Sequence, residues 1–185
     1  MTLAPTIAAV LLAAQASAEP TPPAPPAAPP APCASDHHRA FDFWIGEWDV
    51  FVTGSDEKAG ESLIERVSNG CAIRETWMPM QGEGGTSLSL LNHRSDRWEQ
   101  LWIGSDGRRV DFIGGAVDGR MVLTGYWDDI GGPGRDGLIR MTFTAHPDGS
   151  VHQFGQASGG HGLGWVTSFD FTYRPKSNAS SGKAQ

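Results

Sequence analysis

The stretch that decides the fold is FDFWIGEWDV, residues 41–50, which holds four aromatic residues, three carboxylates and one glycine. A solvated linker does not carry large rings at this density, so the stretch opens a hydrophobic core. From Trp48 to Thr53 apolar and polar residues alternate, which is the pattern of a half-buried strand. We therefore expect a short helical turn over residues 36–44 that leads under a β-barrel and continues as its first strand.

Short strand patterns fill the rest of the domain, separated by turns in which Gly is paired with Asn, Asp, Ser or Pro. Ile139, Met141 and Phe143 share one face of their segment, and Phe169 shares a face with Trp165 in the last one. The ten expected strands are residues 46–53, 61–68, 71–78, 86–92, 98–103, 109–113, 121–126, 138–145, 151–156 and 165–174.

The absence of crossover helices determines the fold class. No segment of ten or more residues has helical periodicity apart from the turn at 36–44, so consecutive strands are expected to pair antiparallel. Closing such a sheet removes its edges. The sequence predicts an all-β, antiparallel up-and-down β-barrel of about ten strands, similar to a lipocalin or calycin, with an open sandwich as the alternative.

The first 32 residues differ in composition from the domain. Residues 1–18 carry no charge and end in Ala-Ser-Ala after a short apolar run, which predicts a secretory signal peptide, although no Lys or Arg precedes the run. A disordered alanine-rich leader is the alternative. Residues 19–32 are mostly Pro and Ala, which is typical of a semi-rigid linker. We expect a periplasmic or secreted protein with its barrel at 33–174 and a disordered tail at 175–185.

Charge limits the range of partners. The net charge is −7 and no basic stripe is present, which argues against nucleic acid and anionic membranes as partners. The apolar run near the N-terminus is too short to span a bilayer, so no transmembrane segment is expected after signal cleavage.

The chain has two cysteines, Cys33 and Cys71. In an exported protein an even pair is most simply a disulfide. Two alternatives remain open from the residues alone: two free buried thiols, or metal ligation together with His37 and His38.

Candidate ligand-binding residues are polar side chains that share strand faces with tryptophan. Glu75 lies on the expected face of Trp77, and Gln100 lies on that of Trp102. Barrels of this size either fill their interior or enclose one small ligand, and the alternative is a structural module whose tryptophans pack a filled core. The sequence predicts a small hydrophobic or amphipathic ligand inside the barrel, bound by Glu75, Trp77, Gln100, Trp102, Gln153 and Trp165.

Catalysis and cofactor binding are further alternatives. A hydrolase or isomerase acting on such a molecule would use Glu65, Glu75 and His152 if these side chains converged, because burial raises the pKa of a carboxyl group. Heme bound through His152 or His161 is a further alternative. No metal or other cofactor is predicted, because Zn²⁺ needs three or four ligands at converging spacing.

A set of motifs spans the domain: FDFWIGEWDV at 41–50, GCAIRETW at 70–77, WEQLWI at 98–103, Asp106-Gly107, Trp165 and FDFTYR at 169–174. Together they resemble an uncharacterised bacterial family of lipocalin-like, calycin-type domains, often exported. The resemblance covers residues 33–174 and implies a β-barrel but no established reaction. Exported relatives often have cysteines at the positions of Cys33 and Cys71, so it also implies the disulfide. At 158–165 this chain reads SGGHGLGW, without the acidic residue that the family usually has there.

Overall fold

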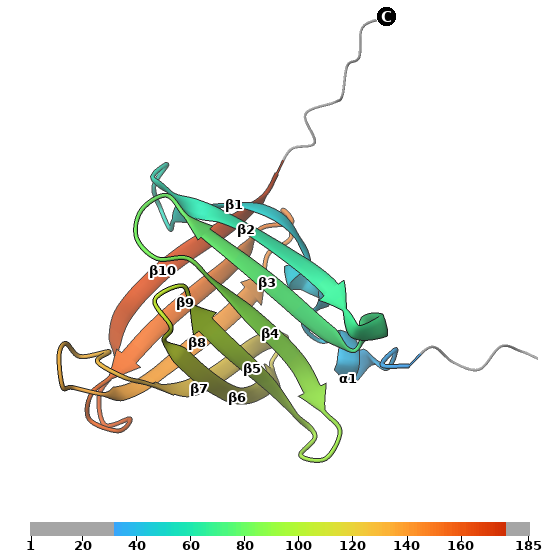
Figure 1. The fold of residues 1–185 in the computed structure, drawn as a ribbon. Coiled ribbons are helices and arrows are strands. Elements are labelled where there is room, and N and C mark those ends of the chain that lie inside the picture. Colours follow the sequence, from blue (N-terminus) through green and yellow to red (C-terminus); the bar gives the residue numbers. More distant parts are fainter. Residues whose placement is uncertain (1–31, 177–185) are drawn as a thin grey trace, which may run out of the picture.

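Ten β-strands follow one another along the chain, preceded by two short helices (Figure 1). This computed structural model describes residues 32–176. The predicted signal peptide at 1–18, most of the predicted linker at 19–32 and residues 177–185 of the predicted tail lie outside the described residues. The elements are α1 (Asp36–Arg39), η1 (Asp42–Trp44), β1 (Gly46–Val52), β2 (Lys58–Val67), η2 (Ser68–Gly70), β3 (Ala72–Pro79), β4 (Gly85–Asn92), β5 (Arg97–Gly104), β6 (Arg109–Val117), β7 (Arg120–Trp127), β8 (Gly137–Ala145), β9 (Val151–Ser158) and β10 (Val166–Pro175).

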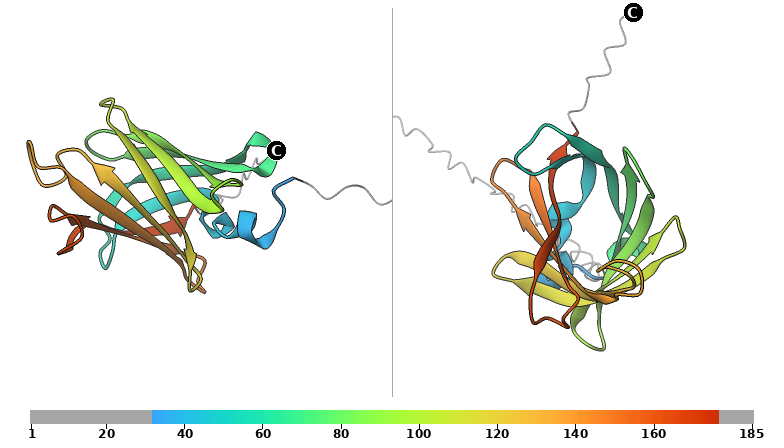
Figure 2. Two further views of the ribbon diagram at one scale, coloured as in Figure 1. Left: turned by 90° about the horizontal axis from the view of Figure 1, so that it is seen from below. Right: turned by 90° about the vertical axis from the view of Figure 1, so that its left-hand side faces the viewer.

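The sheet is a closed antiparallel meander. Each strand pairs with its sequence neighbours, and β1 pairs with both β2 and β10, so that no edge remains (Figure 2). The predicted up-and-down barrel and its entry turn are confirmed, and the alternative of an open sandwich is excluded. β10 runs to Pro175 and the Lys176 amide donates to the Glu47 carbonyl at 2.9 Å, so ordered pairing reaches beyond the predicted boundary at 174.

Alternation of side chains divides the interior from the exterior. In β8, Ile139, Met141 and Phe143 are buried, whereas the intervening Arg140 and Thr142 are only partly covered. This is the face that the sequence pattern predicts, because successive side chains of a strand point to opposite sides of the sheet.

A β-bulge changes this pattern in β10. Thr167 is opposite Gln156 and Phe169 is opposite Gly155, so Ser168 is an extra residue between two paired positions. One extra residue moves the preceding side chains to the other face. Phe169 therefore faces the interior, but Trp165 does not, and its ring lies outside the barrel under the Arg140 guanidinium, 4.2 Å from the ring centroid.

The N-terminal segment fills one end of the barrel. Phe41 and Trp44 are completely buried and stack on each other with ring centroids 4.9 Å apart. Both rings also contact Phe143, and Phe41 meets Trp98 edge-on at the start of β5. We call Phe41, Trp44 and the residues between them the N-terminal plug. In the right-hand view of Figure 2, the blue N-terminal segment lies at the far end of the barrel.

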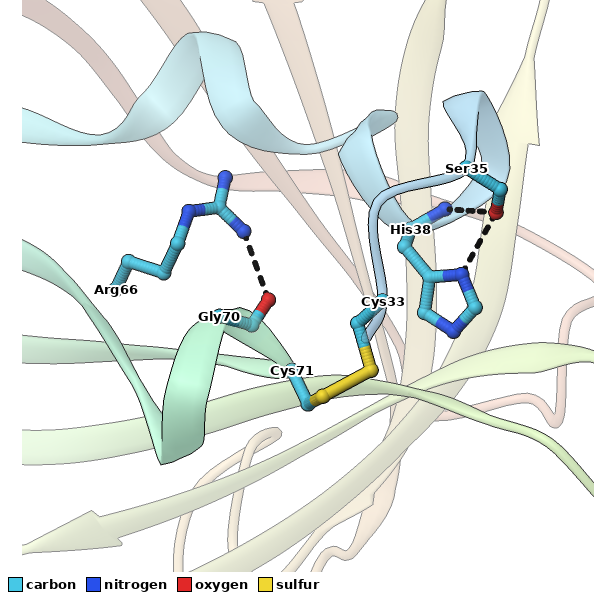
Figure 3. Close-up of a disulfide and its surroundings, with 6 residues drawn as sticks. All are labelled: Cys33, Ser35, His38, Arg66, Gly70 and Cys71. Atoms are coloured by element: carbon cyan, nitrogen blue, oxygen red, sulfur yellow. Dashed lines mark hydrogen bonds between the residues drawn. A yellow bond between two sulfur atoms is a disulfide. The ribbon is translucent and has the colours of Figure 1, made fainter. Parts of the chain in front are cut away.

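A disulfide fixes the start of the domain to the barrel wall. Cys33 and Cys71 are bonded, with Cα atoms 5.1 Å apart, so the predicted disulfide is confirmed and the alternatives of free thiols or thiolate ligands are excluded (Figure 3). Cys71 follows the tight turn of η2, where Arg66 donates to the Gly70 carbonyl at 3.0 Å. The bond therefore joins the segment before the plug to the β2–β3 connection.

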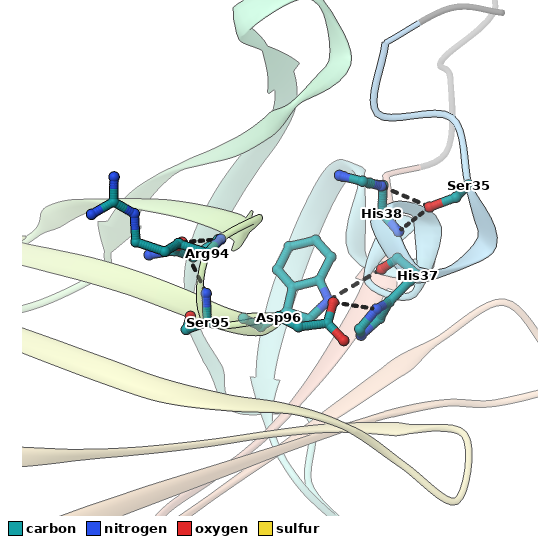
Figure 4. A network of polar contacts seen from close by, with 8 residues as sticks. Ser35, His37, His38, Arg94, Ser95 and Asp96 are labelled. Atoms are coloured by element: carbon teal, nitrogen blue, oxygen red, sulfur yellow. Dashed lines mark hydrogen bonds and ion pairs between the residues drawn. The ribbon is translucent and has the colours of Figure 1, made fainter.

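Polar contacts hold α1 against the neighbouring β4–β5 turn. His37 Nδ1 lies 3.2 Å from an Asp96 carboxylate oxygen, and the Trp98 indole N–H donates to the His37 carbonyl (Figure 4). His38 instead bonds to Ser35, the N-cap of α1. Within the described range, no helix has both the length and the apolar character needed to cross a membrane.

Candidate functional site: a cavity in the open half of the barrel

The half of the barrel away from the plug encloses a cavity of about 470 Å³. The plug contacts Trp98 at the start of β5, whereas the cavity is bordered by Trp102 and Gly104 near the end of the same strand. The interior is therefore neither empty throughout nor completely filled. The lining residues are Glu75, Trp77, Glu83, Gly84, Gln100, Trp102, Gly104, Asp106, Arg108, Phe112, Trp127, Met141, Gln153, Phe169, Phe171 and Tyr173.

Aromatic rings form much of the cavity wall. Phe169 and Phe171 on β10 are stacked with centroids 5.4 Å apart, and Trp77 from β3 stacks on Phe171 at 5.9 Å. Gly155 on β9 makes room for this arrangement, because a Cβ atom there would lie 2.4 Å from the Phe169 ring. The wall is therefore apolar and flat-faced, as is typical of pockets for small organic molecules.

A buried carboxyl group lies at the inner end of the cavity. Glu75 on β3 is 6% exposed, and its two oxygens accept hydrogen bonds from the hydroxyls of Ser62 at 3.2 Å and Ser87 at 2.9 Å. These serines come from β2 and β4, the two strands that flank β3. The local pairing therefore brings both hydroxyls to the carboxyl group and fixes its orientation.

Burial changes the acidity of this group. Desolvation raises the pKa of Glu75 from 4.5 to about 7, and the hydroxyls of Ser87, Ser62 and Tyr173 offset only part of the effect. Burial and the neighbouring Glu75 carboxylate also raise the pKa of Tyr173 well above its ordinary value, so that phenol stays neutral. The Tyr173 hydroxyl donates to Gln153 Oε1 at 2.7 Å.

The raised pKa of Glu75 predicts a pH dependence of stability. The folded state keeps its proton up to a pH of about 7, whereas the unfolded chain loses it near 4.5, so the free energy of unfolding falls as the pH rises between these values. At 1.36 kcal/mol per pKa unit the loss is about 3 kcal/mol, complete somewhat above the folded pKa. The Glu75→Gln variant has no carboxyl group at this position, so it should not show this loss between pH 4.5 and about 7.

The measurement is urea unfolding of both proteins at about pH 5 and about pH 8, where most of this difference is expressed. At each pH the free energy of unfolding of the variant is subtracted from that of the wild type. This removes the contributions of all other titrating groups, because both proteins share them. If that difference is the same at both pH values, the environment of Glu75 described here is wrong.

Two glutamines complete the polar inner end. Gln100 on β5 is 3% exposed and its Nε2 donates to Ser89 Oγ at 2.9 Å. Gln153 accepts from Tyr173, as described above, and its Nε2 points to the Met141 sulfur at 3.4 Å. Each amide is therefore held in a defined orientation by a neighbouring side chain.

The mouth of the cavity carries charged side chains on its loops. Arg108 Nε lies 3.1 Å from an Asp106 carboxylate oxygen, and Glu83 accepts a hydrogen bond from Ser105 at 2.5 Å. Arg108 is thus already paired, and Glu83 adds a negative charge beside it. The mouth is more acidic than basic.

The structure brings most of the predicted ligand-binding residues together. Glu75, Trp77, Gln100, Trp102 and Gln153 all line the cavity. Trp165 does not, because the bulge at Ser168 places it outside the barrel. The sequence analysis missed Ser62, Ser87 and Tyr173 as partners of Glu75 and Gln153. Only their position in the sequence could have indicated them, because each is a hydroxyl-bearing residue on the inward face of a strand.

The residues named for the catalytic and heme alternatives do not meet inside the barrel. Glu65 is bonded to Arg74 at 2.6 Å on the outer face, and His152 is paired with Asp170 at 2.6 Å, also outside. The trio of Glu65, Glu75 and His152 therefore does not converge, because strand alternation puts only Glu75 inside. His161 lies exposed in the β9–β10 loop. Among residues 32–176, no group of three or more His, Cys, Asp and Glu is arranged to hold a metal ion.

Comparison with known proteins adds no assignment to this geometry. No protein-family model matches the chain, and a search of curated proteins finds no significant match. What can be stated of its class comes from the fold: the chain is a ten-stranded antiparallel β-barrel of lipocalin-like architecture with a cavity in one half.

Proposed function

We propose that this chain is an exported, lipocalin-like carrier that binds one small, largely apolar molecule inside the barrel. The observation that carries the proposal is a cavity of about 470 Å³ with aromatic walls and a small set of oriented polar groups at its inner end. That volume lies within the range of about 300–1,000 Å³ found for ligand pockets. A barrel that served only as a structural module is expected to have a filled interior, because an empty cavity lowers stability.

Export is supported by two features of the chain. The Cys33–Cys71 disulfide is typical of proteins that fold in oxidising compartments. The uncharged apolar leader with its Ala-Ser-Ala ending is typical of a secretory signal. The proposed location is the periplasm or the extracellular medium.

The carrier proposal predicts that the cavity takes up the neutral fluorescent probe N-phenyl-1-naphthylamine. Replacing Met141 by tryptophan should fill part of the cavity and weaken binding at least about tenfold, because the probe and the new ring compete for the same space. The measurement is a fluorescence titration, with the ligand-dependent rise in melting temperature as a second readout.

The matched control is Thr142→Trp, which adds the same ring to the next residue of β8 on the outer face. It should leave the affinity unchanged. Equal binding by wild type and the Met141 variant, or no binding by wild type, would contradict the proposal.

Catalysis is the second candidate function, and one observation favours it. Glu75 has a pKa of about 7 inside an apolar cavity, where a carboxyl group can give and take a proton near neutral pH. An enzyme would convert the extracted native ligand and lose turnover in Glu75→Gln, whereas a carrier would return that ligand unchanged.

A further inference from the structure

We infer that the cavity takes an amphipathic amine, a ligand with a primary ammonium group on an aromatic or aliphatic body. The ammonium group would contact Glu75 and Gln100 at the inner end, and the body would lie between the aromatic side chains of the wall. This inference names the ligand class of the same cavity and therefore rests on the proposed carrier function.

The first argument is the missing countercharge of Glu75. The polar groups around it are neutral hydroxyls, those of Ser62, Ser87 and Tyr173, and within residues 32–176 no Lys, Arg or His forms an ion pair with it. A buried carboxylate without a cation is costly, whereas one that meets a cation and keeps its hydrogen bonds is stabilised. A ligand ammonium group would supply the charge that the protein does not.

The second argument is the excess of acceptors. Gln100 donates through Nε2 to Ser89, and its carbonyl oxygen accepts from none of the described side chains. The Glu75 carboxylate has about four lone-pair sites, more than the hydroxyls of Ser62, Ser87 and Tyr173 occupy. A primary ammonium group offers three donors and no acceptor. An anionic head group would instead need cations and donors, and the one cation of the lining, Arg108, is at the mouth and paired with Asp106.

The third argument is the wall above the polar groups. Trp77, Trp102 and Phe171 line the same cavity as Glu75, and Trp77 and Phe171 are stacked on each other. Cations are attracted to the faces of aromatic rings, and tryptophan is the strongest of these partners. The same rings bury the apolar body of the ligand, so the wall suits both parts of an amphipathic amine.

The raised pKa of Glu75 adds a pH dependence. The other titratable groups of the cavity are Tyr173 beside it and Glu83, Asp106 and Arg108 at the mouth. Only the ionised carboxylate would hold the ammonium group, and its fraction rises about tenfold between pH 6 and pH 8 for a pKa of about 7. Amine affinity should rise by about the same factor, and binding near neutral pH should release protons to the buffer.

The test uses three probes with one body: tryptamine, the neutral alcohol tryptophol and the anion indole-3-acetate. In calorimetric titrations of the wild type at pH 8, tryptamine is expected to bind at least about tenfold more tightly than tryptophol, because a hydrogen-bonded ion pair replaces a neutral contact. Indole-3-acetate should bind most weakly. Proton release is measured by repeating the tryptamine titration in buffers of different ionisation enthalpy.

Two variants test whether Glu75 causes the preference for tryptamine over tryptophol. Glu75→Gln should bring the tryptamine-to-tryptophol ratio close to one, and Glu65→Gln, which removes a carboxylate from the outer face, should leave the ratio unchanged. If Glu75→Gln proves unstable, the pH dependence and proton release of the wild type decide the question by themselves.

The outcomes separate this inference from the carrier proposal. Uptake of N-phenyl-1-naphthylamine with equal binding of tryptamine and tryptophol overturns the amine inference and leaves the carrier intact. A tryptamine preference that Glu65→Gln also abolishes overturns the inference too, since general attraction to an acidic protein would then explain it. A wild type that takes up none of the four probes overturns both.

Discussion

Replacing Trp44 by alanine is expected to lower the free energy of unfolding by about 3–5 kcal/mol, which is a large part of the stability of an ordinary domain. Trp44 is completely buried, and its ring packs against Phe41 and Phe143 with centroids 4.9 Å from each. These neighbours are held by the barrel wall and by other rings, so they cannot collapse into the space. The measurement is urea unfolding followed by tryptophan fluorescence and circular dichroism.

The matched control is Trp44→Phe, which keeps a large ring at the same position. It also removes a buried indole N–H that has no hydrogen-bond partner among the described residues. Because an unsatisfied buried donor is itself unfavourable, the cost of this variant should be at most about 2 kcal/mol. Equal losses in the two variants would mean that ring packing in the plug contributes little.

Removing the disulfide is the second change with a large expected effect. The double variant Cys33→Ser and Cys71→Ser releases a loop of 38 residues, and the chain-entropy model gives a loss of about 4 kcal/mol. For a domain of this length the melting temperature should fall by about 10 °C. The physical reason is the larger conformational freedom of the unfolded chain, together with looser attachment of the segment that leads into the plug.

The wild type treated with a strong reductant is the control for this prediction. The sequence has no other cysteines, so reduction changes only this bond. The reduced wild type and the double variant should melt at the same temperature. A double variant as stable as the oxidised wild type would show that the barrel alone fixes the position of the plug.

The fold could be predicted from the sequence because period-two alternation and turn residues are local signals. The segment 138–145 shows this well, since the buried Ile139, Met141 and Phe143 of β8 are the residues that alternation places on one face. The last strand shows the limit. An extra residue at Ser168 is invisible in a strand pattern, and it reversed the side on which Trp165 lies.

The candidate site was predictable only in part, for a related reason. Alternation places Glu75 and Gln100 inside, but it does not determine which neighbouring strand supplies the hydroxyls around them, since that depends on register. Nor does it tell a filled barrel from an open one. Trp98 and Trp102 are four residues apart on one face, yet Trp98 packs on the plug while Trp102 borders the cavity.

The position of the disulfide has a consequence for how the protein is presented to its surroundings. Cys33 is bonded at the β2–β3 connection, beside the plug, whereas the cavity mouth lies at the other end of β3, near Gly84. The chain therefore enters the domain at the end of the barrel that holds the N-terminal plug. A partner or surface that held the protein by this end would leave the cavity mouth facing away from it, accessible to arriving molecules.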